Sequence, residues 1–231
     1  MLEDLKQKVW QANLDLVQYN LVLLTWGNVS AIDRERGLVA IKPSGIEYTN
    51  LKASDIVIVN LEGTIIEGAL NPSSDTPTHL ALYKAFKQIV AIAHTHSEYA
   101  TIFAQAEMEI PCLGTTHADY FPGSVPVTRL LSEAEVSEDY EGNTGKIIIE
   151  RFSNIIPLEM PAVLVAGHGP FTWGVSASEA VKNSLILERV AKMAFGTMLL
   201  KENKDALAQY IMQKHYERKH GPYAYYGQKK K

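Results

Sequence analysis

The apolar run Ile89-Val90-Ala91-Ile92-Ala93 is followed directly by His94-Thr95-His96. A run of this length with no polar position predicts a strand that is buried on both faces of a sheet. Because side chains alternate along a strand, two histidines separated by one residue project from the same side. The sequence therefore predicts a buried strand that ends in a pair of neighbouring imidazoles.

The two histidines can serve as metal ligands, or they can lie on a polar surface and hold nothing. Their place at the end of a buried strand favours the ligand role, because buried imidazoles need partners. His168 and Asp75 would complete a set of three imidazoles and one carboxylate. Such a set suits zinc or a similar divalent ion. Asp75 also precedes an expected helix, and for this residue alone a capping role is an equally good interpretation.

Periodicity and turn residues predict one α/β domain over residues 1–231, in which helices flank a mixed, largely antiparallel central sheet. The residues Leu2, Leu5, Val9, Ala12 and Leu16 recur at steps of three and four, which indicates an amphipathic helix. A second helix is expected to begin with Thr76 as its N-cap and Pro77 in its first turn, and a third after Ser176, which forms a capping box with Glu179. Further strands are expected at residues 38–41, 56–59, 64–66, 162–165 and around Thr172-Trp173.

Composition limits the possible functions. The 231 residues carry a formal net charge of -4, which gives no reason to expect binding to nucleic acid or to a membrane surface. The acidic N-terminus and the absence of a long apolar block predict a cytoplasmic protein. Cys112 is the only cysteine, and its apolar neighbours predict a small buried hydrophobe and not a nucleophile. We interpret Lys229-Lys230-Lys231 as a disordered basic tail.

Three separate segments have the composition of an anion-binding site. Trp26-Gly27-Asn28, Lys42-Pro43-Ser44-Gly45 and Ser73-Ser74 offer an amide, an ammonium group, hydroxyls and glycine backbone that can approach a phosphate closely. Each segment alone also fits an ordinary turn, because glycine and serine are common turn residues. Together with the candidate metal ligands, the three segments indicate a small phosphorylated polyol as the ligand.

Six segments form a pattern that is much more specific than any one of them. They are Thr25-Trp26-Gly27-Asn28-Val29-Ser30, Lys42-Pro43-Ser44-Gly45, Pro72-Ser73-Ser74-Asp75-Thr76-Pro77-Thr78-His79, His94-Thr95-His96-Ser97, Gly114-Thr115-Thr116-His117-Ala118-Asp119-Tyr120 and Ala224-Tyr225-Tyr226-Gly227-Gln228. Together they resemble the class II aldolase/adducin family, and within it the enzymes that epimerise a ketopentose 5-phosphate. The resemblance extends over nearly the whole chain, from Met1 to Gln228.

The resemblance implies a role for each matched position. It implies one zinc ion per subunit, although other divalent metals can occupy such sites, and a ring-shaped homotetramer in which adjacent subunits share each active site. Asp119 and Tyr226 match the catalytic acid/base pair, although as residues alone they also fit a turn cap and an aromatic in a loose tail. His215 and Arg218 match positions near the substrate. The implied zinc ligands are Asp75, His94, His96 and His168, and the implied substrate contacts are Gly27, Asn28, Lys42, Ser44, Gly45, Ser73 and Ser74.

The activity implied by the resemblance is the interconversion of L-ribulose 5-phosphate and D-xylulose 5-phosphate. The hydrogen on carbon 4 of this sugar is not alpha to the carbonyl at carbon 2, so simple proton removal cannot invert that centre. Retro-aldol cleavage between carbons 3 and 4 gives an enediolate and glycolaldehyde phosphate, whose aldehyde can rotate before the bond forms again. Arabinose catabolism and ascorbate degradation both pass through L-ribulose 5-phosphate, and the resemblance fits either pathway.

Two other interpretations stay open. An aldolase of the L-fuculose-phosphate type would release the two fragments and would use nearly the same groups. Aldolases of the family carry Glu where this chain has Asp75, and this difference favours the epimerase. A non-catalytic, adducin-like interaction module would keep the fold but would need neither the metal ligands nor the phosphate contacts.

Overall fold

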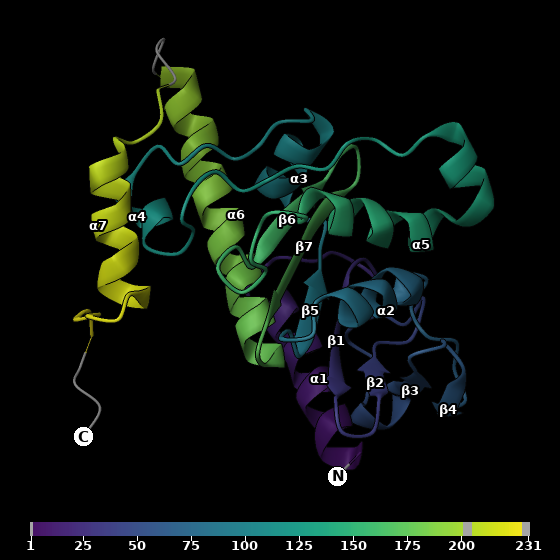
Figure 1. Cartoon of the computed structure of the whole chain (residues 1–231). Coiled ribbons are helices and arrows are strands. Elements are labelled where there is room, and N and C mark those ends of the chain that lie inside the picture. The colour runs from purple at the N-terminus through teal and green to yellow at the C-terminus, as the bar shows by residue number, and fades with distance from the viewer. Residues whose placement is uncertain (1, 201–204, 228–231) are drawn as a thin grey trace.

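The computed structural model describes residues 2–200 and 205–227, and it is built around one seven-stranded sheet (Figure 1). All neighbouring strands of this sheet are antiparallel. The largely antiparallel sheet is therefore confirmed, and parallel pairing among the described residues is limited to an isolated bridge between Val127 and Leu164. In spatial order the strands are β4 (Ile65–Glu67), β3 (Val57–Asn60), β2 (Leu38–Ile41), β1 (Asn28–Asp33), β5 (Ala91–His94), β7 (Gly169–Gly174) and β6 (Ala162–Val165).

Helices cover both faces of the sheet. One face packs against a large apolar cluster to which α2 (Thr76–Ala85), α3 (Glu98–Gln105), α5 (Glu133–Arg151) and part of α6 (Ala177–Leu200) contribute. The other face packs against α1 (Leu2–Gln18) and the first turns of α6. The short η1 (Ala53–Asp55) and α4 (Thr115–Ala118) and the outlying α7 (Gln209–His220) complete the described helices. None of these helices is long and apolar enough to cross a membrane.

Strand β5 is buried on both faces, as its sequence predicts. Ile92 belongs to the larger apolar cluster, whereas Ala91 and Ala93 belong to the smaller one on the opposite face. The strand begins two residues later than the apolar run, and it ends at His94. His96 therefore lies just beyond the strand that was expected to contain both histidines.

Most of the other expected elements are present. The N-terminal helix, the strands at 38–41 and 162–165 and the helix after Ser176 are confirmed, and two strands are shifted by one residue to 57–60 and 65–67. The capping box is formed in part, since Ser176 Oγ accepts from the Glu179 amide at 3.2 Å while the Glu179 carboxylate accepts from the Val175 amide. Cys112 is buried as expected. The expected basic tail, Lys229 to Lys231, lies outside the described residues.

Asn13 joins helix α1 to the sheet. Its side chain is fully buried, and its Nδ2 donates to the carbonyls of Val9 at 2.8 Å and Val29 at 3.2 Å. Its Oδ1 accepts from the Val29 amide at 2.9 Å. One side chain thus satisfies both backbone polar groups of Val29, directly beside Asn28 at the start of β1.

We expect Asn13→Ala to lower the free energy of unfolding by about 1–3 kcal/mol, because it leaves the buried amide and carbonyl of Val29 without their partner. Urea unfolding of the purified protein measures this loss. Gln7→Ala, at an exposed position of the same helix, is the matched control and should change the stability by less than about 0.5 kcal/mol. Equal stability of the two variants would contradict this role of Asn13.

Candidate metal centre and active site

The register of three neighbouring strands brings the candidate site together. Asn28 at the start of β1 lies opposite His94 at the end of β5, and His94 in turn lies opposite Phe171 of β7. His168 occupies the turn between β6 and β7, one residue before β7 begins. Residues that are far apart in sequence therefore meet at one end of these three neighbouring strands.

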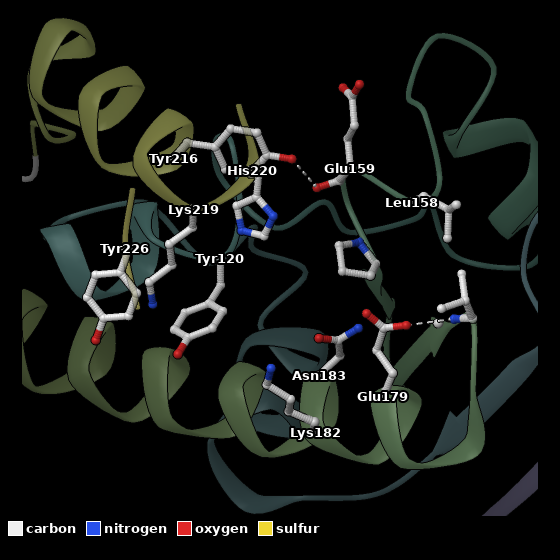
Figure 2. Close-up of a pocket in the computed structure, with 13 residues that line it drawn as sticks. Tyr120, Leu158, Glu159, Glu179, Lys182, Asn183, Tyr216, Lys219, His220 and Tyr226 are labelled. Carbon is white, nitrogen blue, oxygen red and sulfur yellow. Dashed lines mark hydrogen bonds between the residues drawn. The ribbon is translucent and has the colours of Figure 1, made fainter. Parts of the chain in front are cut away.

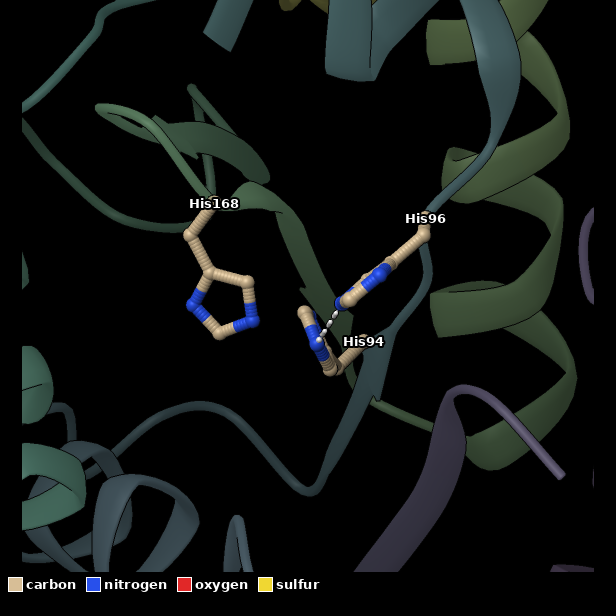
Figure 3. A group of neighbouring side chains, drawn as sticks. All are labelled: His94, His96 and His168. Atoms are coloured by element: carbon tan, nitrogen blue, oxygen red, sulfur yellow. Dashed lines mark hydrogen bonds between the residues drawn. The ribbon is translucent and has the colours of Figure 1, made fainter. Parts of the chain in front are cut away.

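Three imidazoles converge at this end of the strands (Figure 3). The candidate ligand atoms of His94, His96 and His168 all lie within 4.8 Å of one another, and the Nε2 atoms of His94 and His96 are 3.1 Å apart. In a tetrahedral zinc site with Zn–N distances of about 2.0–2.1 Å, two ligating nitrogens lie about 3.3 Å apart. The arrangement thus fits a small divalent ion without rebuilding of the backbone.

The tautomer of His94 is fixed by its surroundings. Its Nδ1 donates to the Pro170 carbonyl oxygen at 3.0 Å, and its ring stacks on Phe171 with 4.1 Å between the ring centroids. The proton on Nδ1 leaves the Nε2 lone pair free and directed toward the other imidazoles. Histidines that bind metals in proteins commonly have this kind of support.

The other two imidazoles are held in the neutral form that a metal requires. Burial, together with the neighbouring His94, lowers the pKa of His96 to about 4. Burial and the same neighbour lower the pKa of His168 to about 3. Both rings are therefore unprotonated at neutral pH, so a bound ion would not have to displace protons from them.

Asp75 lies beside the three imidazoles, in the same cavity. It occupies the N-cap position of α2, where Thr76 was expected, and its carboxylate makes no capping hydrogen bond. Instead, Oδ2 accepts from Asn28 Nδ2 at 2.7 Å. Burial alone would raise the pKa of Asp75, but the charges of His94 and His79 and the bond from Asn28 outweigh it and hold the pKa below its usual value. Asp75 is therefore an ionised carboxylate beside the three imidazoles, of which His96 and His168 are neutral.

One cavity of about 390 Å³ contains all the sequence-predicted metal and phosphate positions. Gly27 must be a glycine here, because its φ is +73° and a Cβ would lie 2.7 Å from the His94 carbonyl oxygen. Lys42 is 2% exposed and has no carboxylate partner within residues 2–200 and 205–227, and burial lowers its pKa to about 8. The predicted residues that line the cavity are Gly27, Asn28, Lys42, Ser44, Gly45, Ser73, Ser74, Asp75, His94, His96 and His168.

The cavity also contains two residues that sequence reasoning missed, Tyr140 and Glu141. Helix α5 is interrupted at Asp139, whose backbone is non-helical (φ -164°, ψ 87°), and the two missed residues follow this break. Burial and the negative charges of Asp75 and Glu141 raise the pKa of Tyr140, so its hydroxyl is protonated at neutral pH. In the sequence, the only local signal of the break is Asp139 three residues before Gly142, within the segment that forms α5.

Asp119 lies in a second cluster, against helix α7. Its carboxylate accepts from Arg218 Nε at 2.8 Å and Nη2 at 2.6 Å, and from His215 Nδ1 at 3.1 Å. Burial would raise its pKa, but the bonds from Arg218 and His215 lower it more, so Asp119 is ionised at neutral pH. The structure thus brings together three of the four residues that were expected near the acid/base chemistry.

Tyr226 completes this second cluster. The guanidinium of Arg218 lies 5.0 Å and the ammonium of Lys219 lies 4.4 Å from the centre of its ring. Figure 2 shows Tyr226, Lys219, Tyr120 and His220 along one side of a cavity of about 520 Å³, opposite Lys182 and Asn183 of α6. No described residue lines both this cavity and the one that contains the three imidazoles. Within one chain, Tyr226 lines this second cavity and Asp119 lines neither, so no acid/base candidate borders the cavity of the imidazoles.

The chain belongs to the class II aldolase family: the family model described as "Class II Aldolase and Adducin N-terminal domain" matches residues 7–195. The expected family is thus confirmed. The match ends within α6, so α7 and Tyr226 lie beyond it.

Particular relatives extend the similarity to the C-terminal part. L-ribulose-5-phosphate 4-epimerase UlaF from Salmonella paratyphi C is 54% identical over 228 residues, which cover 99% of this chain and 100% of the relative, and the protein of that name from Salmonella typhi matches equally. Among solved structures, an L-fuculose 1-phosphate aldolase has a TM-score of 0.79 at 29% identity, over 93% of this chain and 95% of that chain.

His117 supports the loop that carries Asp119, and its titration predicts how stability depends on pH. Its Nε2 donates to the Gly123 carbonyl oxygen at 2.8 Å, and burial lowers its pKa to about 4 in spite of that bond. An unfolded histidine titrates near about 6.5, so between about pH 6.5 and 4 only the unfolded chain binds this proton. The contribution of His117 to the free energy of unfolding is fully present above that range and is lost as the pH falls through it.

We therefore expect the free energy of unfolding to fall with acidification, with His117 contributing up to about 1.4 kcal/mol per pH unit. His117→Gln, which can still donate to Gly123, should make this dependence less steep. Urea unfolding at about pH 7.5 and about pH 5, in the presence of a chelator, measures both slopes. Identical slopes for the variant and the parent protein would contradict the assignment.

Proposed function

We propose that this protein is a metal-dependent epimerase that interconverts L-ribulose 5-phosphate and D-xylulose 5-phosphate. The observation that carries the proposal is the convergence of three imidazoles, an ionised Asp75 and the three glycine, serine and lysine segments in one cavity. The names of the relatives that are 54% identical over their full length support the same activity. A phosphorylated sugar does not cross a membrane unaided, so we also propose a cytoplasmic location.

The residues that would hold the metal are His94, His96 and His168, with Asp75 as the fourth ligand. Three nitrogens and one carboxylate oxygen suit zinc, and the same set can accept manganese or cobalt. When bound, the ion supplies positive charge that stabilises the negative charge developing on the substrate oxygens as the bond between carbons 3 and 4 breaks.

The phosphate group would lie against the glycine and serine segments. Gly45 has a φ of +68° and open space where a side chain would be, so its backbone can approach a phosphate closely. Lys42 is nearly buried, its ammonium lies 4.8 Å from the centre of the Tyr48 ring, and its contacts to the carbonyls of Thr25 and Pro43 are long, at 3.4 Å. No carboxylate of the described residues pairs with it, so an anion placed here gains an ammonium partner. This contact would hold the aldehyde fragment while it rotates.

We assign proton transfer at the carbon 4 oxygen to Asp119 and Tyr226. The ionised Asp119 can accept a proton, and the Tyr226 hydroxyl can donate one. Tyr226 lines a different cavity, and neither Tyr226 nor Asp119 lines the cavity of the three imidazoles of the same chain, so a second copy would have to supply them. We therefore propose a homotetramer in which each site combines the metal group of one subunit with Asp119 and Tyr226 of its neighbour, with His215 and Arg218 supporting them.

The second candidate function is a sugar-phosphate aldolase, which is supported by the similarity to L-fuculose 1-phosphate aldolase. The contacts of Asp75 favour the epimerase. Asn28 Nδ2 donates to Asp75 Oδ2 at 2.7 Å and so holds this short side chain beside the imidazoles, which suits a fixed ligand better than a mobile base. An adducin-like module without catalysis would have no need for converging imidazoles or for a buried Lys42 that has no acidic partner among the described residues.

We expect His96→Asn to abolish stoichiometric metal binding and to lower epimerase activity by more than about 100-fold, because it removes one of three converging nitrogens. Metal analysis of the purified protein and conversion of L-ribulose 5-phosphate measure the two effects. Tyr226→Phe should lower turnover by about 100- to 10,000-fold and should retain the metal. Full activity of His96→Asn would contradict the metal assignment, and loss of metal in Tyr226→Phe would contradict the role of Tyr226.

Shared active sites predict that two inactive variants complement each other. In tetramers assembled from equal amounts of His96→Asn and Tyr226→Phe subunits, roughly a quarter of the sites would pair an intact metal group with an intact Tyr226. Activity should therefore recover to roughly a quarter of that of the parent protein. Each variant put through the same unfolding and reassembly alone is the control. No recovery in proven mixed tetramers would mean that one chain forms the whole site.

A further inference from the structure

The break in helix α5 places Tyr140 in the cavity of the metal candidates. After the non-helical Asp139, the helix begins again, and Asp139 Oδ1 accepts from the Gly142 amide at 3.0 Å. A Cβ at Gly142 would clash with the Asp139 carboxylate, so any other residue there would displace the side chain that accepts from this amide. The geometry of the interruption is therefore built into the sequence around Tyr140.

Neighbouring elements hold the break in place. Thr78 Oγ1 of α2 donates to the Glu141 carbonyl at 2.6 Å, and Asn143 Nδ2 donates across the break to the Glu135 carbonyl at 2.8 Å. Thr144 Oγ1 donates to the carbonyl of Tyr140 itself at 2.8 Å. The first of these bonds links Glu141, the residue after Tyr140, to α2, the helix that begins directly after Asp75. The backbone of Tyr140 is thus fixed relative to the candidate metal ligands.

The Tyr140 hydroxyl lies 3.4 Å from His168 Nδ1. Figure 3 shows that the other ring nitrogen of His168, Nε2, points toward His94 and His96. Among the described residues, Tyr140 is the hydrogen-bond partner of the Nδ1 side of this ring, as the Pro170 carbonyl is for His94. The two imidazoles therefore have analogous support, one from the backbone and one from a tyrosine.

We propose that Tyr140 is a positioning residue, whose hydroxyl oxygen accepts the Nδ1 proton of His168 and so directs the Nε2 lone pair of that histidine toward the metal. The inference rests on the proposed metal site. A tyrosine hydroxyl can accept a hydrogen bond while it keeps its own proton, so it can take this role without ionising. Binding of a cation at Nε2 makes the Nδ1 proton a stronger donor, and the contact should shorten from 3.4 Å when the site is loaded.

The test compares the metal affinity of Tyr140→Phe with that of the parent protein. Phenylalanine keeps the ring and removes only the hydroxyl, so the fold should be retained. Tyr99→Phe is the matched control, because Tyr99 is also partly buried but lies outside the cavity. Apoprotein of each form is titrated with zinc in competition with a chromophoric chelator. We expect a loss of affinity of about 10- to 100-fold for Tyr140→Phe and no loss for Tyr99→Phe.

Activity provides the second measurement. If Tyr140 acts only through His168, the activity of Tyr140→Phe should be low at limiting zinc and should return to within a few-fold of the parent kcat when zinc is in excess. Unchanged affinity, or an equal loss in both variants, would overturn the proposal. A fully zinc-loaded Tyr140→Phe protein that stays inactive would also overturn it, because Tyr140 would then act on the substrate directly.

The same titration separates this proposal from the proposed function. Parent protein that binds zinc but does not epimerise L-ribulose 5-phosphate would refute the activity and leave the affinity comparison of Tyr140→Phe intact. Parent protein that binds no zinc would overturn both.

Discussion

The register between β1, β5 and β7 is the constraint on which the site depends. It aligns Asn28, His94 and Phe171 in one row across the sheet. Backbone pairing thus sets the position of His94, of the Asn28 amide that holds Asp75, and of the Phe171 ring on which His94 stacks. A slip of one residue would turn His94 to the other face of the sheet. The apolar clusters on both faces prevent such a slip, because Ile92 and its neighbours Ala91 and Ala93 would exchange environments.

Helices add the groups that the sheet cannot supply. Helix α2 begins at the carboxylate beside the imidazoles, and the interrupted α5 brings Tyr140 and Glu141 to the same cavity. Helix α7 has no buried residue of its own, and it is joined to Asp119 through Arg218 and His215. His94 therefore rests on a strand that is buried on both faces, whereas Arg218 and His215 come from a helix without a buried residue. Such a division suits a site that is completed by assembly of subunits.

The sequence predicted the parts of the site that depend on local patterns. The apolar run before His94 and the glycine and serine segments were recognisable because alternation and turn chemistry act over a few residues. Tyr140 was not recognisable, because its position depends on a helix break that Thr78 and Asn143 hold from other segments. Asn13 was missed for a similar reason, since a buried asparagine in an apolar face gains meaning only from its contact with β1. The separation of Asp119 from the three imidazoles is likewise a property of the folded chain.

We propose that the converging imidazoles serve an epimerase that keeps both fragments of its substrate. The most direct measurement follows L-ribulose 5-phosphate by NMR with purified protein, first loaded with zinc, then after chelation and again after zinc is restored. We expect D-xylulose 5-phosphate in the first and third states only, with no accumulation of glycolaldehyde phosphate. Accumulation of the fragments alone would identify an aldolase, and no conversion by zinc-loaded protein would contradict the epimerase assignment.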